Sequence, residues 1–362
     1  MKNKNVAIIG AAGFVGIELV RQLEHQNDLK LFAITRENGS FILEGRNIEL
    51  LNPKDISDDY SFDIVINLAY PTSGPPHLYP AINKNILDTI KKLANSKSRI
   101  IHVSTQAVFG FEMDKDIHNQ FLKNRKDFPY IEAKLAMENL VNTTFPNNEL
   151  NIVRLGNVWG AASGSWTGAI ADKLLFGQYV GVKNQDGFAN ITDVKNVASY
   201  LAFLINLEKL EGRKIYHIAE FGEYKWSHIV DLIAQKLNVE PVYSDVNPNY
   251  SHSLRQDISG TLQLPKVGDT YRELVWGRYS GSYLRSLIRF LGPEKFSRIK
   301  KTETRNLPTT SKLSKAEETF LTVVTSQVHF KSELHPSWKP LISFDQSWQL
   351  INDWFKVAGY TK

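Results

Sequence analysis

The chain has 362 residues, of which 42% are hydrophobic and 22% charged, with a formal net charge of +5. This composition excludes a disordered chain and indicates a globular protein with a sizeable core. The absence of cysteine excludes disulfides and cysteine-ligated zinc and is consistent with a cytoplasmic location. The modest charge does not indicate a nucleic acid partner, and no apolar run approaches the roughly 20 residues that cross a bilayer.

Residues 6–23 predict a strand, a glycine turn and a helix. Residues 6–9 are apolar and rich in β-branched side chains, as expected of a strand buried on both faces. Gly10, Gly13 and Gly16 follow, and apolar residues then recur at helical spacing. The free N–H groups at the start of such a helix bind phosphate, and glycine lets the phosphate approach the backbone. We therefore predict a dinucleotide-binding turn rather than glycines that only tighten a turn.

A second predicted strand, residues 29–35, ends where a dinucleotide fold meets the adenosine ribose. An acidic residue there binds the free 2′-hydroxyl of NAD, whereas a basic residue accommodates the 2′-phosphate of NADP. This chain has Arg36 directly after Thr35, with Glu37 next. We expect NADP as the cofactor, with NAD as the alternative, because Arg36 could also stack on adenine or be an ordinary surface residue.

Strands and helices alternate over the following residues. Residues 62–69 and 99–104 predict buried strands, and residues 82–94 predict a helix between them. Short alternating elements indicate the α/β class, with a Rossmann-type doubly wound parallel sheet. Ligands of such sheets lie at the carboxyl ends of the strands, and Thr105 lies at one of these ends.

Tyr130 and Lys134 lie four positions apart at the start of a predicted helix. Residues at i and i+4 share one face of a helix, so both side chains point the same way. A free tyrosine has a pKa of about 10 and is a poor base at neutral pH, but a neighbouring ammonium lowers that pKa. We expect Tyr130 to be a proton shuttle, although the spacing alone also fits a solvated helix face.

Four motifs occur in a recognisable order and spacing. They are Gly10-Ala-Ala-Gly13-Phe-Val-Gly16, Val103-Ser-Thr-Gln-Ala-Val-Phe-Gly110, Tyr130-Ile-Glu-Ala-Lys134 and Val153-Arg-Leu-Gly-Asn-Val-Trp-Gly160. Together they resemble the extended short-chain dehydrogenase/reductase superfamily, in its NAD-dependent epimerase/dehydratase family. The resemblance covers residues 6–230 and fades beyond them.

The resemblance implies roles for individual residues. Tyr130 would be the general acid/base on a substrate hydroxyl or ketone, with Lys134 on the nicotinamide ribose and Thr105 on the same substrate oxygen. Asn157 would also bind the substrate. Arg255 weakly resembles a phosphate-binding arginine of the family and would do so too, although a plain surface residue is the favoured interpretation. The implied cofactor-binding residues are Gly10, Gly13, Phe14, Val15, Gly16, Arg36, Asp55, Ile56, Leu68, Ala69, Asn85, Tyr130 and Lys134.

Some of these cofactor residues have specific implied contacts. Asp55 and Ile56 resemble a pair that contacts adenine, and Leu68 and Ala69 would pass behind the cofactor. Asn85 resembles the helix asparagine that steadies the active-site strand.

The residues after Thr105 limit the reaction. Relatives that eliminate water from a sugar, or decarboxylate it, carry an acidic residue beside the active-site threonine, whereas this chain has Gln106 and Ala107. The resemblance thus implies an epimerase or ketoreductase that acts on a nucleotide-activated sugar by hydride transfer. The alternatives are an NADP-dependent reductase of a non-nucleotide carbonyl compound and a non-catalytic regulator that senses the dinucleotide. Retention of Thr105, Tyr130 and Lys134 speaks against the regulator.

We expect a dinucleotide-binding domain over residues 1–156, with return segments near 189–220. Residues 157–188 and 221–362 would form a smaller substrate-binding lobe. Its basic amphipathic segment 283–301 could contact an anionic membrane surface or accept a lipid-linked substrate, but packing on the lobe is favoured. The expected partner is a small molecule, no metal site is predicted, and the resemblance implies a homodimer.

Three further local predictions concern the second half of the chain. Residues 215–219 predict an edge strand, and residues 225–237 and 343–358 predict helices. Asp193 precedes another predicted helix and is expected to be its N-cap.

Overall fold

The structure is a computed structural model that describes residues 3–35, 41–56, 60–71, 75–111, 128–208, 212–246 and 315–361. Its main feature is a sheet of seven parallel strands in the order β10-β6-β5-β4-β1-β2-β3. The strands are β1 (Lys4–Ile9), β2 (Leu29–Ile34), β3 (Glu49–Leu51), β4 (Phe62–Asn67), β5 (Ala94–Thr105), β6 (Leu150–Leu155) and β10 (Lys214–Ile218). The predicted doubly wound sheet is confirmed, and so is the edge position of β10.

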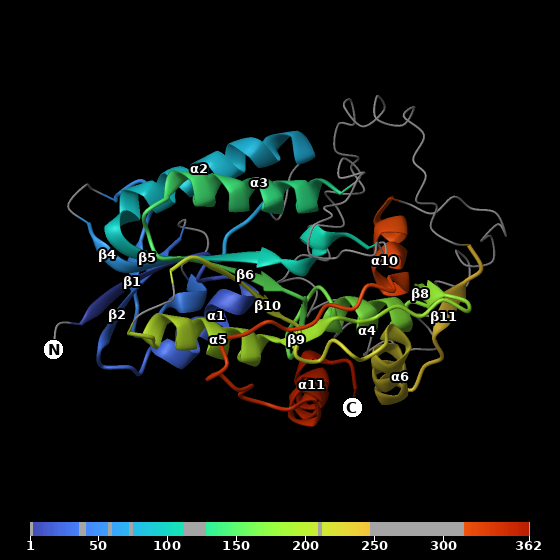
Figure 1. Cartoon of the computed structure of the whole chain (residues 1–362). Coiled ribbons are helices and arrows are strands. Elements are labelled where there is room, and N and C mark those ends of the chain that lie inside the picture. The colour runs from blue at the N-terminus through green and yellow to red at the C-terminus, as the bar shows by residue number, and fades with distance from the viewer. Residues whose placement is uncertain are drawn as a thin grey trace.

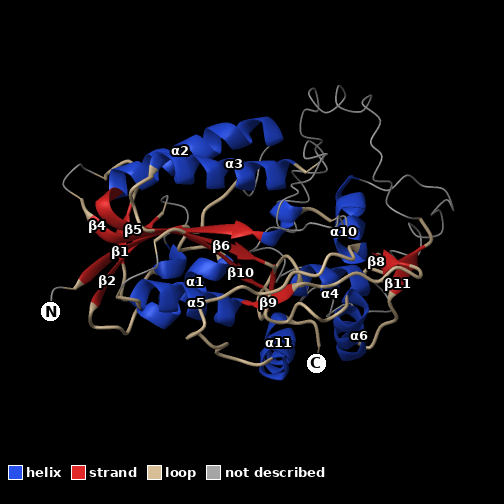
Figure 2. Cartoon of the chain, viewed as in Figure 1, coloured by secondary structure: helices blue, strands red, loops and turns tan. Residues whose placement is uncertain are grey.

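Helices cover both faces of the sheet (Figures 1 and 2). One face carries α1 (Phe14–Leu23) and α5 (Val194–Asn206), and the other carries α2 (Tyr79–Leu93) and α3 (Pro129–Thr144). Each helix turns an apolar stripe toward the strands, which is why the strands themselves are apolar on both sides. The helix residues buried on the two faces include Leu19, Leu23, Val197 and Leu201 on the first and Ile90, Leu93, Met137 and Val141 on the second.

A second hydrophobic core lies beside the carboxyl ends of the strands (Figure 1). The elements here are β7 (Asn157–Trp159), α4 (Thr167–Leu175), β8 (Tyr179–Val182), β9 (Ile191–Asp193), α6 (Trp226–Leu237), β11 (Val242–Ser244), α10 (Lys315–Thr325) and α11 (Phe344–Ala358). The predicted terminal helix is confirmed as α11, which begins with a capping box of Ser343 and Gln346 and buries Ile351 and Phe355.

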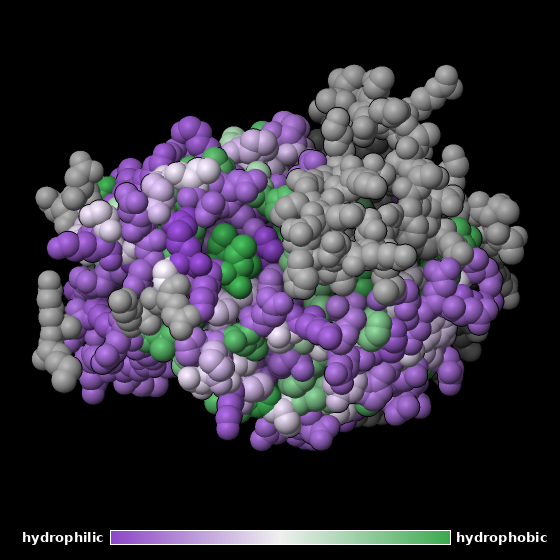
Figure 3. All heavy atoms as spheres, viewed as in Figure 1, coloured by the Kyte–Doolittle hydropathy of each residue, from purple (hydrophilic) through white to green (hydrophobic). Residues whose placement is uncertain are grey.

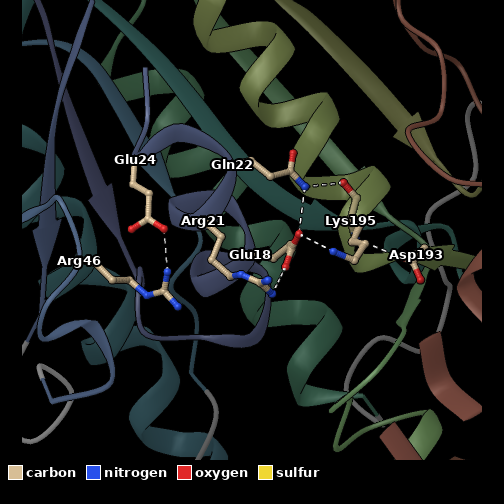
Figure 4. A network of polar contacts seen from close by, with 7 residues as sticks. All are labelled: Glu18, Arg21, Gln22, Glu24, Arg46, Asp193 and Lys195. Atoms are coloured by element: carbon tan, nitrogen blue, oxygen red, sulfur yellow. Dashed lines mark hydrogen bonds and ion pairs between the residues drawn. The ribbon is translucent and has the colours of Figure 1, made fainter. Parts of the chain in front are cut away.

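A buried carboxylate joins α1 to α5 (Figure 4). Glu18 is only 8% exposed, and its Oε1 lies 3.3 Å from Nζ of Lys195. Gln22 donates to the same carboxylate and to the carbonyl oxygen of Lys195. Asp193 caps α5 as predicted, because it accepts from the backbone N–H of Lys195, and it also accepts from the Ser347 hydroxyl of α11. The helix that follows the glycine turn is thus tied to the C-terminal helix.

The surface shown has no large continuous hydrophobic area (Figure 3). On the face shown in Figure 3, hydrophobic residues form small patches separated by hydrophilic ones. Among the helices of the described residues, none has both the length and the apolar character needed to span a membrane.

We predict that Gly16→Ala destabilises the protein by about 1–3 kcal/mol, because overpacking forces the backbone apart. A Cβ at Gly16 would lie 2.6 Å from the carbonyl oxygen of Ala11 and closer still to that of Gly10. Gly164→Ala is the matched control, since its Cβ would meet nothing within 4 Å. Urea unfolding of the two variants measures the difference, and equal stability would contradict the packing described here.

Candidate functional site

The glycine turn after β1 leaves the start of α1 open to a ligand. Gly10 has φ of +86°, and Gly13 is the N-cap of α1 without a side-chain cap. The first N–H groups of a helix have no partner within it, so those of α1 point out of the turn. Phe14 and Val15, in this first turn, are half-buried. A Cβ at Gly10 would lie 3.0 Å from the backbone nitrogen of Ala69, so the loops after β1 and β4 touch.

These features fit the pyrophosphate of a dinucleotide. The uncapped helix end supplies N–H donors and a positive dipole, and the glycines leave the backbone uncovered. The turn also lies where strand order reverses, between β1 and β4, which is where doubly wound sheets bind nucleotides. Leu68 donates its N–H to the carbonyl oxygen of Ile9, at 2.9 Å, which places Leu68 and Ala69 beside the turn.

Of the residues expected to contact the adenosine part of the cofactor, only some are among the described residues. Ile56 is buried in the cluster that contains Ile9 and Ile34, and Asp55 beside it is exposed. Arg36, on which the expected choice of NADP depends, lies outside the described residues.

Thr105, Tyr130 and Lys134 come together from two elements. Thr105 ends β5, and Tyr130 and Lys134 lie on the first two turns of α3. The hydroxyl groups of Thr105 and Tyr130 are hydrogen-bonded, and Thr105 Oγ1 also accepts from the N–H of Ala107 at 3.2 Å. Lys134 is 4% exposed, and its Nζ donates to the carbonyl oxygen of Val103 at 3.1 Å.

The electrostatics correct one expectation from the sequence. Lys134 was expected to lower the pKa of Tyr130, but that pKa is raised, chiefly by burial and secondarily by Tyr70, with the Thr105 hydrogen bond opposing. The Tyr130 residue as a whole is 39% exposed, so part of it still faces solvent. Burial also lowers the pKa of Lys134 to about 7, against the attraction of Glu138. A lysine that is partly neutral near pH 7 cannot strongly favour a phenolate.

Tyr70 is a second aromatic residue at this point, beside Tyr130, and the sequence did not single it out. It follows β4, and its ring centroid lies 5.5 Å from that of Tyr130 in an edge-to-face arrangement. The Nζ atom of Lys134 lies over the Tyr70 ring, 4.3 Å from its centroid. Tyr70 thus contacts both members of the tyrosine–lysine pair, and the cation–π contact favours the charged amine.

The asparagine that holds the start of α3 is Asn83 rather than Asn85. Asn83 is 2% exposed on α2 and donates to the carbonyl oxygen of Ala133 at 2.7 Å. Asn85 lies on the exposed face of the same helix. The two residues differ by about 200° around the helix axis, so only one of them can face α3.

A small hollow of about 20 Å³ lies beside Thr105. It is lined by Thr105, Gln106, Ala107, Phe111, Leu155, Gly156, Asn157, Phe188, Asn190, Val323, Ser326 and Phe330. Asn157 therefore lies in the same hollow as Thr105, and its amide nitrogen donates to the carbonyl oxygen of Ala189 at 2.7 Å. Arg255 and segment 283–301 lie outside the described residues.

The lining of the hollow by residues 323–330 was not predicted. This segment consists of the end of α10 and the residues after it. It is joined to residues 187–190 by backbone hydrogen bonds from Gly187 to Val324 and from Phe188 to Ser326. Gly187 permits the contact, because a Cβ there would lie 2.5 Å from the Ser326 carbonyl oxygen. A glycine at position 187 can indicate close packing of the backbone, but the sequence does not show which segment packs against it.

A comparison with known protein families identifies the family of this chain. The family described as "RmlD substrate binding domain" matches residues 4–259. The chain belongs to this family. This agrees with the motifs at residues 10–16 and 130–134 and with the sheet, and it confirms the resemblance to extended short-chain dehydrogenase/reductases.

Individual relatives are distant. The N-acetyl-alpha-D-glucosaminyl-diphospho-ditrans,octacis-undecaprenol 4-epimerase of Escherichia coli O157:H7 is 22% identical over 249 residues, covering 65% of this chain and 73% of that protein. Among solved structures, UDP-N-acetylglucosamine 4-epimerase from Methanobrevibacter ruminantium has a TM-score of 0.53 at 20% identity, covering 75% of this chain and 96% of that one. ADP-L-glycero-D-manno-heptose-6-epimerase of Helicobacter pylori has a TM-score of 0.53 at 19% identity, covering 67% and 85%.

We predict that Lys134 makes the stability of the ligand-free protein rise with pH. Its pKa is about 7 in the folded chain and 10.5 in the reference state, so between these values the unfolded chain binds more protons. Where the unfolded chain binds one full proton more than the folded chain, the free energy of unfolding rises by about 1.4 kcal/mol per pH unit. Lys134→Met should remove this rise, whereas the exposed Lys91→Met should keep it. Urea unfolding from about pH 7 to about pH 10 tests this, and parallel curves for all three proteins would refute it.

Proposed function

We propose that the chain is an epimerase of a sugar carried on a nucleotide diphosphate, with a nicotinamide dinucleotide as cofactor. The observation that carries the proposal is the convergence of the glycine turn, the Thr105–Tyr130–Lys134 group and the hollow at one edge of the sheet. The names of the distant relatives support it, because three of them are epimerases of diphosphate-linked sugars. A ketoreductase for the same class of sugar is the alternative that these residues also allow.

The dinucleotide would lie across the sheet edge. The N–H groups at the start of α1 would bind its pyrophosphate, Ile56 and Asp55 would contact the adenine, and Leu68 and Ala69 would pass behind it. When bound, the nicotinamide would supply the acceptor and donor for a hydride. The solved UDP-glucuronic acid 4-epimerase of Bacillus cereus, at a TM-score of 0.52 and 17% identity, is described as a complex with NAD. For this chain we keep NADP as the proposal, because of Arg36.

The chain's own residues would move the proton. Tyr130 and Thr105 would both hydrogen-bond the substrate hydroxyl, since their own hydroxyl groups already meet. Tyr130 would remove the hydroxyl proton as that oxygen becomes a carbonyl and return it when the hydroxyl re-forms. Burial keeps Tyr130 protonated in the ligand-free protein, which suits the acid step. The base step needs Lys134 in its charged form, and its pKa of about 7 lets that form be populated at neutral pH.

A sugar on a polyprenyl diphosphate is a second candidate substrate. The curated relative from Escherichia coli is named as an epimerase of such a compound. In this chain, segment 283–301 combines an apolar stripe with basic residues, which is a composition that binds anionic lipid surfaces. The diphosphate and the sugar are common to both candidates, so the proposed chemistry at Tyr130 is the same.

We predict that Tyr130→Phe lowers epimerase turnover by about 100-fold or more, because general acid–base catalysis contributes about that much. Dinucleotide affinity should change little, since only one hydroxyl is removed. Tyr179→Phe, in β8, is the matched control. Activity is measured by product analysis on UDP-sugars and on an undecaprenyl-diphosphate sugar, and normal turnover by Tyr130→Phe would refute the mechanism.

The same assay separates the alternatives. Net consumption of reduced dinucleotide would indicate a reductase, with a non-nucleotide ketone as its substrate if UDP-sugars fail. Tight dinucleotide binding without turnover of any substrate would indicate a sensor.

We predict that Arg36→Ala weakens NADP binding by roughly 10- to 100-fold, because a charge-assisted hydrogen bond to the 2′-phosphate is lost. NAD binding should be unchanged. Titration calorimetry with both dinucleotides measures the change, and Arg21→Ala, on the exposed side of α1, is the control. Equal effects on NAD and NADP would show that Arg36 does not select between them.

A further inference from the structure

Tyr70 covers the amine of Lys134. The Nζ atom of Lys134 lies over the Tyr70 ring, 4.3 Å from its centroid, and the same ring meets Tyr130 edge to face with 5.5 Å between the centroids. Tyr70 is 40% exposed and Tyr130 is 39% exposed, whereas Lys134 is only 4% exposed. The buried lysine is therefore in contact with two tyrosines that themselves face solvent.

The position of Tyr70 is set by the strand before it. Asn67, the last residue of β4, is fully buried, and its Oδ1 accepts from the backbone N–H of Ala69 at 3.0 Å. The amide nitrogen of Asn67 lies 3.0 Å from Nδ1 of His102 on β5. These contacts hold the chain just before Tyr70 against the sheet. The ring thus reaches Lys134 from an element other than the helix that carries the lysine.

The charged and titratable groups around the amine do not explain its low pKa. Glu138, one turn further along α3, attracts the ammonium, but its carboxylate oxygens are bonded to Arg154 at 3.1 and 2.7 Å. His102 has a pKa of about 3, lowered by burial and secondarily by Lys134, so it is neutral at pH 7. Tyr130 stays protonated there because its pKa is raised. Exclusion of water is therefore the cause that lowers the pKa of Lys134.

Tyr70 acts on the lysine in two opposite ways. Its π face attracts the ammonium, and such a contact is worth roughly 2- to 30-fold in proton affinity. Its ring also keeps water from the amine, which favours the neutral form. The pKa of Lys134 falls from 10.5 to about 7, roughly a few thousandfold in proton affinity, since each pH unit is tenfold. The loss of water thus outweighs the cation–π attraction.

We propose that Tyr70 is a positioning residue whose ring shields the Lys134 amine from water and keeps it on the Val103 carbonyl oxygen, beside Tyr130. The inference deepens the proposed function and rests on it for activity, because Tyr70 would act on the proton transfer through Lys134. With the shield in place, the charged lysine that the base step needs is lost as the pH rises through about 7. Without the shield, the charged form would persist to higher pH.

The test measures the titration of Lys134 in the ligand-free protein by NMR of isotope-labelled lysine side chains. The Lys134 signal is the one that titrates at a pH of about 7 and is lost in Lys134→Met. In Tyr70→Ala its midpoint should rise by at least about one pH unit, because water reaches the amine. Tyr70→Ser is a second variant that removes the ring and should behave alike.

Two controls separate the shield from a general effect of substitution. Tyr70→Phe keeps the ring and should titrate as the wild type does. Tyr60→Ala changes the tyrosine just before the other end of β4, and it should also leave the Lys134 midpoint unchanged.

The direction of the shift decides the outcome. An unchanged midpoint in Tyr70→Ala would overturn the inference, and a lower one would show that the cation–π contact dominates and overturn it too. So would a wild type in which no lysine titrates near pH 7. The pH profile of kcat/KM, which reports the free enzyme, should lose its high-pH activity about one unit later in Tyr70→Ala. A shifted NMR midpoint in a protein without epimerase activity would contradict the proposed function and leave the role of Tyr70 standing.

Discussion

Four central strands of the sheet, β1, β4, β5 and β6, run in the same direction, and their alignment brings the loops of the site to one edge. In this arrangement Ile9 lies opposite Asn67, Asn67 opposite His102, and Thr105 opposite Leu155. The turn after β1, the loop after β4, the threonine that ends β5 and the segment after β6 therefore emerge along one edge. Parallel strands need crossover connections, and the helices that supply them also carry Tyr130 and Lys134 back to this edge.

Burial controls the charges at that edge. Lys134 is enclosed between β5, Tyr70 and its own helix, and this enclosure lowers the pKa of its amine to about 7. The same enclosure raises the pKa of Tyr130. The pair is consequently held near neutrality in the ligand-free protein, where desolvation outweighs the attraction that the two groups would have as ions. A ligand that brings charge or hydrogen bonds into the site changes this balance directly.

The C-terminal part of the chain completes the hollow rather than extending the sheet. Asn190 adopts a left-handed conformation, with φ of +45°, and its amide is bonded to the backbone of Val328 and Phe330. These contacts hold residues 323–330 against the end of β6. The apolar wall of the hollow is therefore assembled from segments more than 130 residues apart, as the Asn190–Val328 separation of 138 shows.

The sequence by itself determined the sheet, the glycine turn and the tyrosine–lysine pair. Each of these depends on a local pattern: alternating apolar runs, glycines at the start of a helix, and an i, i+4 spacing on one helix face. Only the tertiary structure decided that Asn83 rather than Asn85 reaches α3 and that Tyr70 covers Lys134. Those facts depend on which side chains from distant segments meet and on how much water they exclude. Hydrogen-bond satisfaction and desolvation are properties of the packed molecule, and a local pattern does not contain them.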